Sequence, residues 1–593
     1  MSNPLIQLLL AYGPSADGNA MYDEFVLAEA EKSGLPPLEI EEQVSETVID
    51  HLQGDDPCSV ILTGTAGDGK TYTARRVFSA LGAAAWDSTG IVNETLLASG
   101  RKLFVIKDLS ELSSSEKDAW HPRLIDAVEG RSEDRFVVCV NDGQLLSFFR
   151  DRQTDDRATS MFAELTRMLQ AEGSTPADGK PFRLIHMSRR SHARSLTDIF
   201  EKILEHPGWS ACSSSCTAQA SGRTCPILRN REILRAEDGV FRQRIQDSVE
   251  IAAADGRHLA LRQLIILVVN TLLGVDDRGE ARLMTCDRAR SVAQHGSFKL
   301  TNPYSNVLGF NHPAATREGM AVFDTLSRLG IGEETTNRID NALLDEDEAK
   351  ALPQDETYGM PLFEGPRSAY AENPSEKRLV IREALRVQRR RLFFTMSEED
   401  AKRFSDPWCL TKLHAGQAYL DLARVLAEGG GPSIEVQRRI TIGLNRTMTG
   451  YFTDTDSEIW LTRPSGDVHG QSVPLLIDEP VPWTGRRSKA VIAAPRAPGH
   501  PLSLRIVEQG SPLGILRLSP TMFEFLYRVS HGALPGSFGS KCLQDVRTFQ
   551  ITTHGALEKL TRDAGATLRL QAIRLRPGDG ELEARPIKLL EGV

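Results

Sequence analysis

The sequence predicts an α/β fold: a parallel sheet with flanking helices, then a helical lid, and finally a C-terminal α+β module. Apolar runs at 59–63, 102–108, 135–140 and 182–188 have the composition of strands buried in a parallel sheet. Segments with helical spacing separate these runs. Beyond Gly450, short alternating segments are separated by Gly and Pro turns, which is typical of antiparallel strands.

Composition is ordinary for a globular protein. The 593 residues suffice for about three or four domains. The net charge of −10 gives no global sign of nucleic-acid binding, so any such site has to be a local patch. We find no signal-peptide pattern and no run of about 18 apolar residues, so we expect a cytoplasmic protein that does not enter a membrane.

The central motif lies at residues 59–71, Ser-Val-Ile-Leu-Thr-Gly-Thr-Ala-Gly-Asp-Gly-Lys-Thr, where a strand-like run leads into G-x-x-x-x-G-K-T. With the helix-compatible segment 72–81, this is the P-loop pattern in its strand–turn–helix context. We expect Lys70 to reach the β- and γ-phosphates of ATP and the Thr71 hydroxyl to hold Mg²⁺. A glycine-rich turn that binds nothing is the alternative. The predicted nucleotide-binding residues are Gly64, Thr65, Ala66, Gly67, Asp68, Gly69, Lys70, Thr71 and Tyr72.

A second candidate site follows the run 135–140, which ends in Asn141-Asp142. P-loop enzymes carry acidic residues at such a strand end, one for Mg²⁺ and one for the attacking water. Asp142 is the only carboxylate of the pair, so we assign it the main catalytic role, on Mg²⁺ or on water. Asn141 is a weaker metal ligand, which is also consistent with binding and slow turnover.

Three cysteines, Cys212, Cys216 and Cys225, form C-x₃-C-x₈-C among Ser, Gly and Thr residues. A structural zinc site needs four ligands, and the fourth would be His206, Cys286 or a remote residue. The alternative is three surface thiols in an insertion.

A basic stretch begins at Lys377, and most of its members share a helical face, as expected for a surface that binds phosphate backbones. Phe393 and Phe394 follow and would either stack on bases or pack in the core. A solvated helix face or a contact with a partner protein are the alternatives for the basic residues. The stretch comprises Lys377, Arg378, Arg382, Arg386, Arg389, Arg390 and Arg391.

The predicted organisation follows from these motifs and from changes in composition. We expect an N-terminal helical segment at 1–50, a nucleotide-binding domain at 51–195, a helical lid with the cysteine insertion at 196–345, a linker at 346–375, a helical region at 376–450 and an α+β interaction domain at 451–593.

The order of these motifs resembles that of bacterial AAA+-type ATPases of DNA-defence islands, nearest the phosphorothioation-dependent DNA restriction ATPase family. The resemblance covers about residues 1–345. It comprises a Tyr-Gly-Pro start, the G-x-x-x-x-G-K-T loop, VIKDLSEL, VVCVNDGQLL, LIHMSRRS, a three-cysteine insertion ending CPILRN, and LALRQLIILVVNTLLG.

The resemblance implies three further residue roles. Ser188 would sense the γ-phosphate, and Arg189, Arg190 or Arg194 would act on a neighbouring subunit of a homo-oligomer. Arg262, near the start of a buried helix, would contact the nucleotide from the lid. Solvated surface arginines and a salt-bridged Arg262 are the alternatives.

The resemblance also implies the function. We expect an ATP-hydrolysing component of a multi-protein anti-phage or DNA restriction system, with other defence proteins and double-stranded DNA as candidate partners. The competing hypothesis is a nucleotide-sensing scaffold that recruits effector proteins with little turnover.

Overall fold

The computed structural model describes residues 2–13, 23–40, 42–54, 57–82, 84–152, 155–171, 174–212, 216–219, 222–275, 282–463, 474–477, 479–483, 488–495, 499–508, 510–563, 565 and 570–587. The chain divides into two compact units. The first comprises 1–249, 258–328 and 343–397, and the second comprises 250–257, 329–342 and 398–593.

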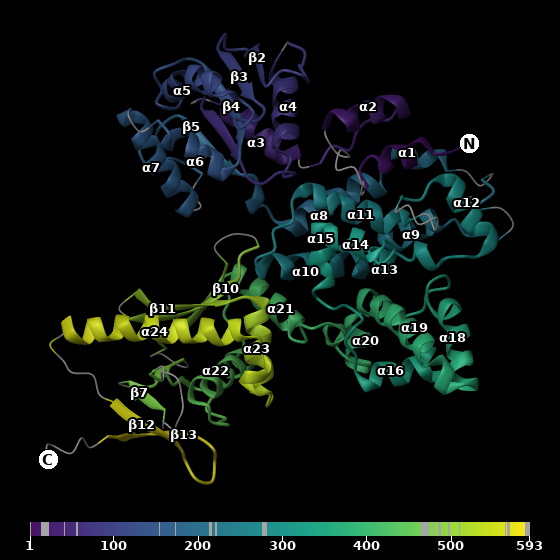
Figure 1. The fold of residues 1–593 in the computed structure, drawn as a ribbon, viewed down its shortest axis with the longest axis vertical. Coiled ribbons are helices and arrows are strands. Elements are labelled where there is room, and N and C mark those ends of the chain that lie inside the picture. The colour runs from purple at the N-terminus through teal and green to yellow at the C-terminus, as the bar shows by residue number, and fades with distance from the viewer. Residues whose placement is uncertain are drawn as a thin grey trace. The chain divides into compact units, whose positions relative to one another are not determined.

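The first unit contains a five-stranded sheet in the order β2-β3-β4-β1-β5 (Figure 1). β1 is central, and it pairs in parallel with β4 (Val60 opposite Val137) and with β5 (Ile61 opposite Leu184). β3 is also parallel to β4, whereas the edge strand β2 is antiparallel to β3 and was not predicted. The predicted α/β fold is therefore confirmed as a mostly parallel sheet. The strands are β1 (Ser59–Thr63), β2 (Val92–Leu96), β3 (Lys102–Ile106), β4 (Arg135–Val140) and β5 (Phe182–His186).

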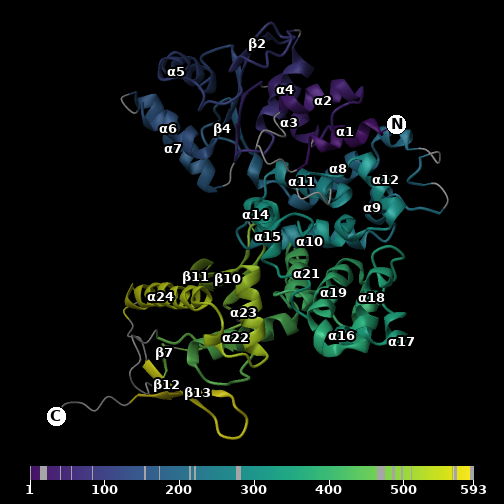
Figure 2. The same cartoon turned by 45° about the vertical axis from the view of Figure 1, so that its right-hand side comes forward.

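Helices cover both faces of this sheet (Figures 1 and 2). Val60 and Leu62 of β1 pack on one face with α3 and α4, and Ile61 packs on the other face with α5, α6 and α7. Since successive strand residues point to opposite faces, a strand covered on both sides has to be apolar throughout. The helices are α3 (Glu42–Gln53), α4 (Lys70–Leu81), α5 (Ser114–Val128), α6 (Asp142–Arg150) and α7 (Asp156–Ala171).

The rest of the first unit is helical. α11 (Leu261–Leu273) is buried on nearly every side and ends at Gly274, as its composition predicts. It packs against α8 (His192–Leu204), α9 (Pro226–Arg235), α13 (Pro303–Asn306) and α15 (Ala321–Ser327). Other elements of this unit are α1 (Pro4–Leu10), α2 (Asp23–Ser33), α10 (Val240–Ala254), except for its last five residues, α12 (Cys286–His295), α14 (Ala314–Gly319), the last two residues of α16 (Asn337–Leu344), and the short 3₁₀ turns η1 (Met187–Arg189), η2 (Pro207–Ala211) and η3 (Lys299–Thr301).

The predicted linker at 346–375 is instead folded into α17 (Glu346–Ala349) and α18 (Met360–Glu372). Asp355 between them is buried and accepts a hydrogen bond from the Tyr304 hydroxyl at 2.9 Å. The acidic and proline-rich composition suggested exposure, but the buried carboxylate has its hydrogen-bond partners within the fold.

The basic stretch lies on α19 (Pro374–Thr395) and corrects a second expectation. Arg389, Arg390 and Arg391 are buried, and Arg390 stacks 3.5 Å from the centre of the Phe310 ring. Phe393 and Phe394 are also buried, so neither is available to stack on bases. Exposed basic residues remain only in the first half of the helix, at Lys377, Arg378 and Arg382.

The second unit combines helices with antiparallel strands, as predicted for the C-terminal region (Figure 1). Its sheets have the orders β11-β10-β9, β13-β12-β7 and β6-β8, and α24 packs on β11. The sequence also predicts an extended tail at 567–570 and 581–590, of which residues 567–569 and 588–590 lie outside the described ranges. The elements are α20 (Glu398–Arg403), η4 (Pro407–Leu410), α21 (Gly416–Ala427), α22 (Ile434–Thr449), β6 (Glu458–Ile459), β7 (Leu475–Ile477), β8 (Val481–Pro482), β9 (Ala490–Ala493), β10 (Leu502–Glu508), β11 (Ser511–Leu518), α23 (Pro520–Ser530), η5 (Pro535–Ser537), α24 (Ser540–Asp563), β12 (Leu570–Leu575) and β13 (Leu582–Pro586).

No helix within the described ranges is long and apolar enough to cross a lipid bilayer.

Candidate functional site

The glycine-rich loop (residues 64–69) connects β1 directly to α4. Gly64, Gly67 and Gly69 have φ values of 144°, 87° and 83°, which residues with a side chain rarely adopt. Gly69 is the N-cap of α4, and Lys70 is the first helical residue. The first N–H groups of a helix have no acceptor within it, so this turn offers donors to an anion.

A second helix begins against the same loop. α11 has Ala260 as its N-cap, which provides no side-chain acceptor. Instead, the Arg262 N–H donates to the Gly67 carbonyl at 3.1 Å. A Cβ added at Gly67 would lie 3.3 Å from the Arg262 Cβ. The positive ends of two helix dipoles therefore border the loop.

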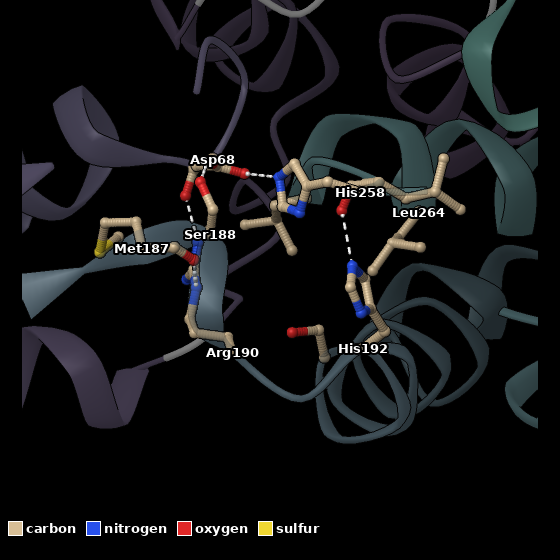
Figure 3. Close-up of a pocket in the computed structure, with 10 residues that line it drawn as sticks. Asp68, Met187, Ser188, Arg190, His192, His258 and Leu264 are labelled. Atoms are coloured by element: carbon tan, nitrogen blue, oxygen red, sulfur yellow. Dashed lines mark hydrogen bonds and ion pairs between the residues drawn. The ribbon is translucent and has the colours of Figure 1, made fainter. Parts of the chain in front are cut away.

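Asp68 ties the loop to its surroundings (Figure 3). Its buried carboxylate accepts hydrogen bonds from the Thr65 N–H at 2.7 Å, from the Ser188 hydroxyl and from His258 Nε2 at 3.1 Å. Burial alone would raise the pKa of Asp68, but these bonds outweigh it and hold the pKa below its usual value. The loop thus carries a fixed negative charge of its own.

A pocket opens beside this carboxylate. Its wall includes His192, whose Nε2 lies 3.1 Å from the Leu259 carbonyl and therefore carries the proton (Figure 3). Burial, with a smaller contribution from the charge of His258, lowers the pKa of His192 to about 4. The lining residues are Asp68, Met187, Ser188, Arg190, His192, Ser195, His258, Leu259, Leu261 and Leu264.

Lys70 lies at the centre of the polar groups at this edge of the sheet. Its Nζ donates to the carbonyls of Gly64 at 3.0 Å and Thr65 at 2.7 Å, and to Asn141 Oδ1 at 3.3 Å. Burial lowers the pKa of Lys70, while Asp68, Cys139, Asp108 and Asp142 oppose this effect. The amine is thus a cation surrounded by acceptors.

The structure separates the roles of Asn141 and Asp142. Asn141 is exposed and contacts Lys70. Asp142 accepts hydrogen bonds from the Thr63 hydroxyl and from His186 Nε2, the latter at 2.9 Å. Burial would raise the pKa of Asp142, but the bonds from His186 and Thr63 lower it overall, so the carboxylate is ionised at neutral pH.

Asp108 is a candidate site residue that was not predicted from the sequence. It follows β3, whose carboxyl end lies at the same sheet edge as those of β1 and β4, and its charge acts on Lys70. Ser110 donates to its carboxylate from the backbone at 2.8 Å and from the hydroxyl at 2.6 Å. The sequence signal that could have identified Asp108 is the apolar run 102–106, which is followed by this carboxylate.

The predicted trans-acting arginines bond within their own domain. Arg189 donates to the Leu169 carbonyl at 2.6 Å, and Arg194 donates to Gln43. Arg190 donates to the Met187 carbonyl at 2.7 Å and to the Asp68 carbonyl of the loop. In this conformation Arg190 therefore holds the loop in cis.

Two other predicted residues flank the loop. Tyr72 on α4 accepts a hydrogen bond from the Ile40 N–H at 3.2 Å, which connects α4 to the segment before α3. Thr71 is exposed in the first turn of α4. The predicted zinc ligands Cys212, Cys216 and Cys225 belong to a different region, between η2 and α9.

No family model matches this chain, and no curated protein or solved structure matches it at a significant level.

Proposed function

We propose that this protein binds ATP with Mg²⁺ at the glycine-rich loop and hydrolyses it, and that the bound nucleotide controls the contact between the loop and α11. The observation that carries the proposal is the strand–loop–helix geometry, in which Lys70 opens α4 after three glycines in left-handed conformations. Backbone N–H groups and a lysine at this position suit the β- and γ-phosphates of a nucleotide.

The residues at the sheet edge fit a magnesium nucleotide. The Thr71 hydroxyl is exposed in the first turn of α4, and Asp108 and Asp142 supply ionisable carboxylates near Lys70. When bound, Mg²⁺ would neutralise charge that develops on the phosphates. Ser188, bonded to both Asp68 and the Thr65 N–H, is positioned to respond to a change in the loop.

The contacts of Asp68 suggest how nucleotide binding reaches the lid. The Thr65 N–H now donates to Asp68, which also bonds His258 just before α11. A phosphate that takes over such N–H groups would alter the Asp68–His258 bond and the Arg262–Gly67 contact together. Binding at the loop is therefore coupled to the start of α11, a switch of the kind that P-loop proteins use.

The role in the cell rests on the motif order alone. We propose that the protein is the ATPase component of a multi-protein DNA-defence system that assembles as a homo-oligomer with other defence proteins. Direct DNA contact would use the exposed Lys377, Arg378 and Arg382 of α19, because the three later arginines are buried.

One observation favours a second candidate, a nucleotide-sensing scaffold with little turnover. The side chain that contacts Lys70 from β4 is the neutral Asn141, and Asp142 is occupied by Thr63 and His186. A site with no carboxylate on the attacking water binds ATP but hydrolyses it slowly.

The first experiment measures ATP binding by calorimetry for the wild type, Lys70→Ala and Lys102→Ala. Lys102 is the matched control because it is an exposed lysine at the start of β3, on the edge of the sheet opposite to the loop. We expect Lys70→Ala to abolish binding and Lys102→Ala to preserve it. Equal affinity of all three proteins would refute the central proposal.

The second experiment separates the two functions. Steady-state ATP hydrolysis is measured with and without double-stranded DNA at two salt concentrations. DNA-stimulated turnover that is lost at high salt supports a DNA-coupled ATPase, since phosphate contacts are salt-dependent. Tight binding without turnover supports the scaffold and excludes hydrolysis as the role of the site.

A further inference from the structure

Four half-buried free cysteines gather in the helical part of the first unit. Cys212 is the C-cap of η2, and Cys216 lies at a bend four residues later. Cys225 is the N-cap of α9, and Cys286 is the first residue of α12, a helix that packs against α9. Three segments of the chain thus bring thiols to one region.

Asn3 and Arg290 contact three of these sulfurs. The Asn3 side-chain amide donates to Cys212 Sγ at 3.0 Å, while its backbone N–H donates to Cys286 Sγ at 3.4 Å. Arg290, on the next turn of α12, donates to Cys216. The thiols of Cys212 and Cys216 are also near enough to interact electrostatically with both Cys225 and Cys286.

Hydrogen-bond donors from the backbone also approach these sulfurs. The Cys225 sulfur accepts backbone N–H bonds from Ile227 and Leu228 in the first turn of α9. Cys286 likewise lies at a helix N-terminus, that of α12. Amide and guanidinium donors directed at cysteine sulfurs are the outer contacts that typically orient metal ligands.

His206 is the other local candidate for the fourth zinc ligand, but both of its ring nitrogens have hydrogen-bond partners. Its Nδ1 accepts the Gly208 N–H at 3.1 Å, and its Nε2 lies 3.4 Å from the Pro36 carbonyl. Of the two local candidates, Cys286 is therefore the better fourth zinc ligand. Across the described part of the chain no three His, Cys, Asp or Glu side chains already stand at ligating distances, so these sulfurs have to close up on an ion.

We propose that Cys212, Cys216, Cys225 and Cys286 bind one Zn²⁺ as a structural site. Four thiolates leave no open position for water, so the ion would have no catalytic role. Its effect is to join the cysteine segment and α9 to α12, with Asn3 bringing the start of the chain onto the same site. This inference is independent of the proposed nucleotide function.

The test is the metal content of the full-length protein after purification without added chelator, measured by mass spectrometry. We expect about one zinc per chain for the wild type, as for a single closed four-thiolate site. Cys286→Ser should lose the zinc. Cys409→Ser, which changes a half-buried free cysteine of the second unit, should retain it.

Two further measurements do not depend on the folding of Cys286→Ser. Titrating the wild type with a mercurial reagent should release zinc as four thiols react, and cobalt substitution should give the charge-transfer absorption of four thiolates. Asn3→Ala should bind zinc about ten- to a hundredfold more weakly. Absence of zinc, full zinc in Cys286→Ser, or iron in place of zinc would each overturn the proposal.

Discussion

Arg190 offers the sharpest test of how the glycine-rich loop is held. Its guanidinium donates to the carbonyls of Met187 and Asp68, so it fastens the loop to the turn after β5. Arg190→Met removes both bonds and the charge but keeps most of the aliphatic stem. If phosphate binding requires this conformation of the loop, the free energy of ATP binding should weaken by as much as Arg190→Met destabilises the loop.

The size of the effect follows from two opposing terms. Hydrogen bonds from a charged donor contribute about 1.5–3 kcal/mol each, or about 3–6 kcal/mol for the two bonds. Burial lowers the pKa of Arg190 from 12.5 to about 10, and that difference corresponds to about 3 kcal/mol of lost solvation. The balance is about 0–3 kcal/mol, and its midpoint of about 1.5 kcal/mol corresponds to ATP binding that is about tenfold weaker.

Calorimetric titration with ATP measures this directly, with Arg189→Met as the matched control. Arg189 is the adjacent arginine, but its guanidinium donates to the Leu169 carbonyl on α7, so its variant should bind ATP like the wild type. Unchanged affinity of Arg190→Met would refute the reasoning. If turnover were also lost and then restored by mixing with Lys70→Ala, Arg190 would act on a neighbouring subunit instead.

Three further predictions concern the same region. Asp108→Asn should lower kcat for ATP hydrolysis at least about a hundredfold with ATP affinity nearly unchanged, because positioned acids and bases contribute factors of this size; equal kcat values would exclude the residue. Gly67→Ala should weaken ATP binding about tenfold, because φ is 87° and left-handed backbone costs about 1–2 kcal/mol, whereas Gly143→Ala, with open space around the added Cβ, should not; calorimetry compares the two. Burial of His192 favours its neutral form and lowers its pKa to about 4, so stability should fall as pH drops from about 6.5 towards 4, by about 1.4 kcal/mol per pH unit. His192→Gln should flatten the pH dependence of the melting temperature, and unchanged slopes would contradict the assignment.

The local elements were largely predictable because each depends on a short pattern. The apolar runs became β1, β3, β4 and β5, and the helix before Gly274 became α11. The antiparallel edge strand β2 was not predicted, because Val92–Leu96 mixes polar and apolar residues and contains no continuous buried run. The folding of the predicted linker into helices was not predicted, because the burial of its acidic residue Asp355 depends on a hydrogen bond from a distant residue in α13.

The basic stretch shows why composition misled. Seven positive charges within fifteen residues indicate a phosphate-binding face when they are counted along the chain. The second half of α19 instead faces the interior of the first unit, where Arg390 stacks on Phe310 and Arg391 donates to the Pro353 carbonyl. Long cationic side chains can be buried when aromatic rings and carbonyls satisfy them.

By itself, the sequence determined the candidate phosphate loop, because glycine spacing, Lys70 and a preceding strand are local properties of the chain. The tertiary structure alone decided what surrounds that loop. Strand order brings Asp108 and Asn141 beside Lys70, and the fold brings His258 and the start of α11 onto Asp68 and Gly67. It also brings Cys286 near Cys212 and Cys216. These contacts join residues far apart in sequence, and burial together with hydrogen-bond satisfaction selects them, which no local pattern records.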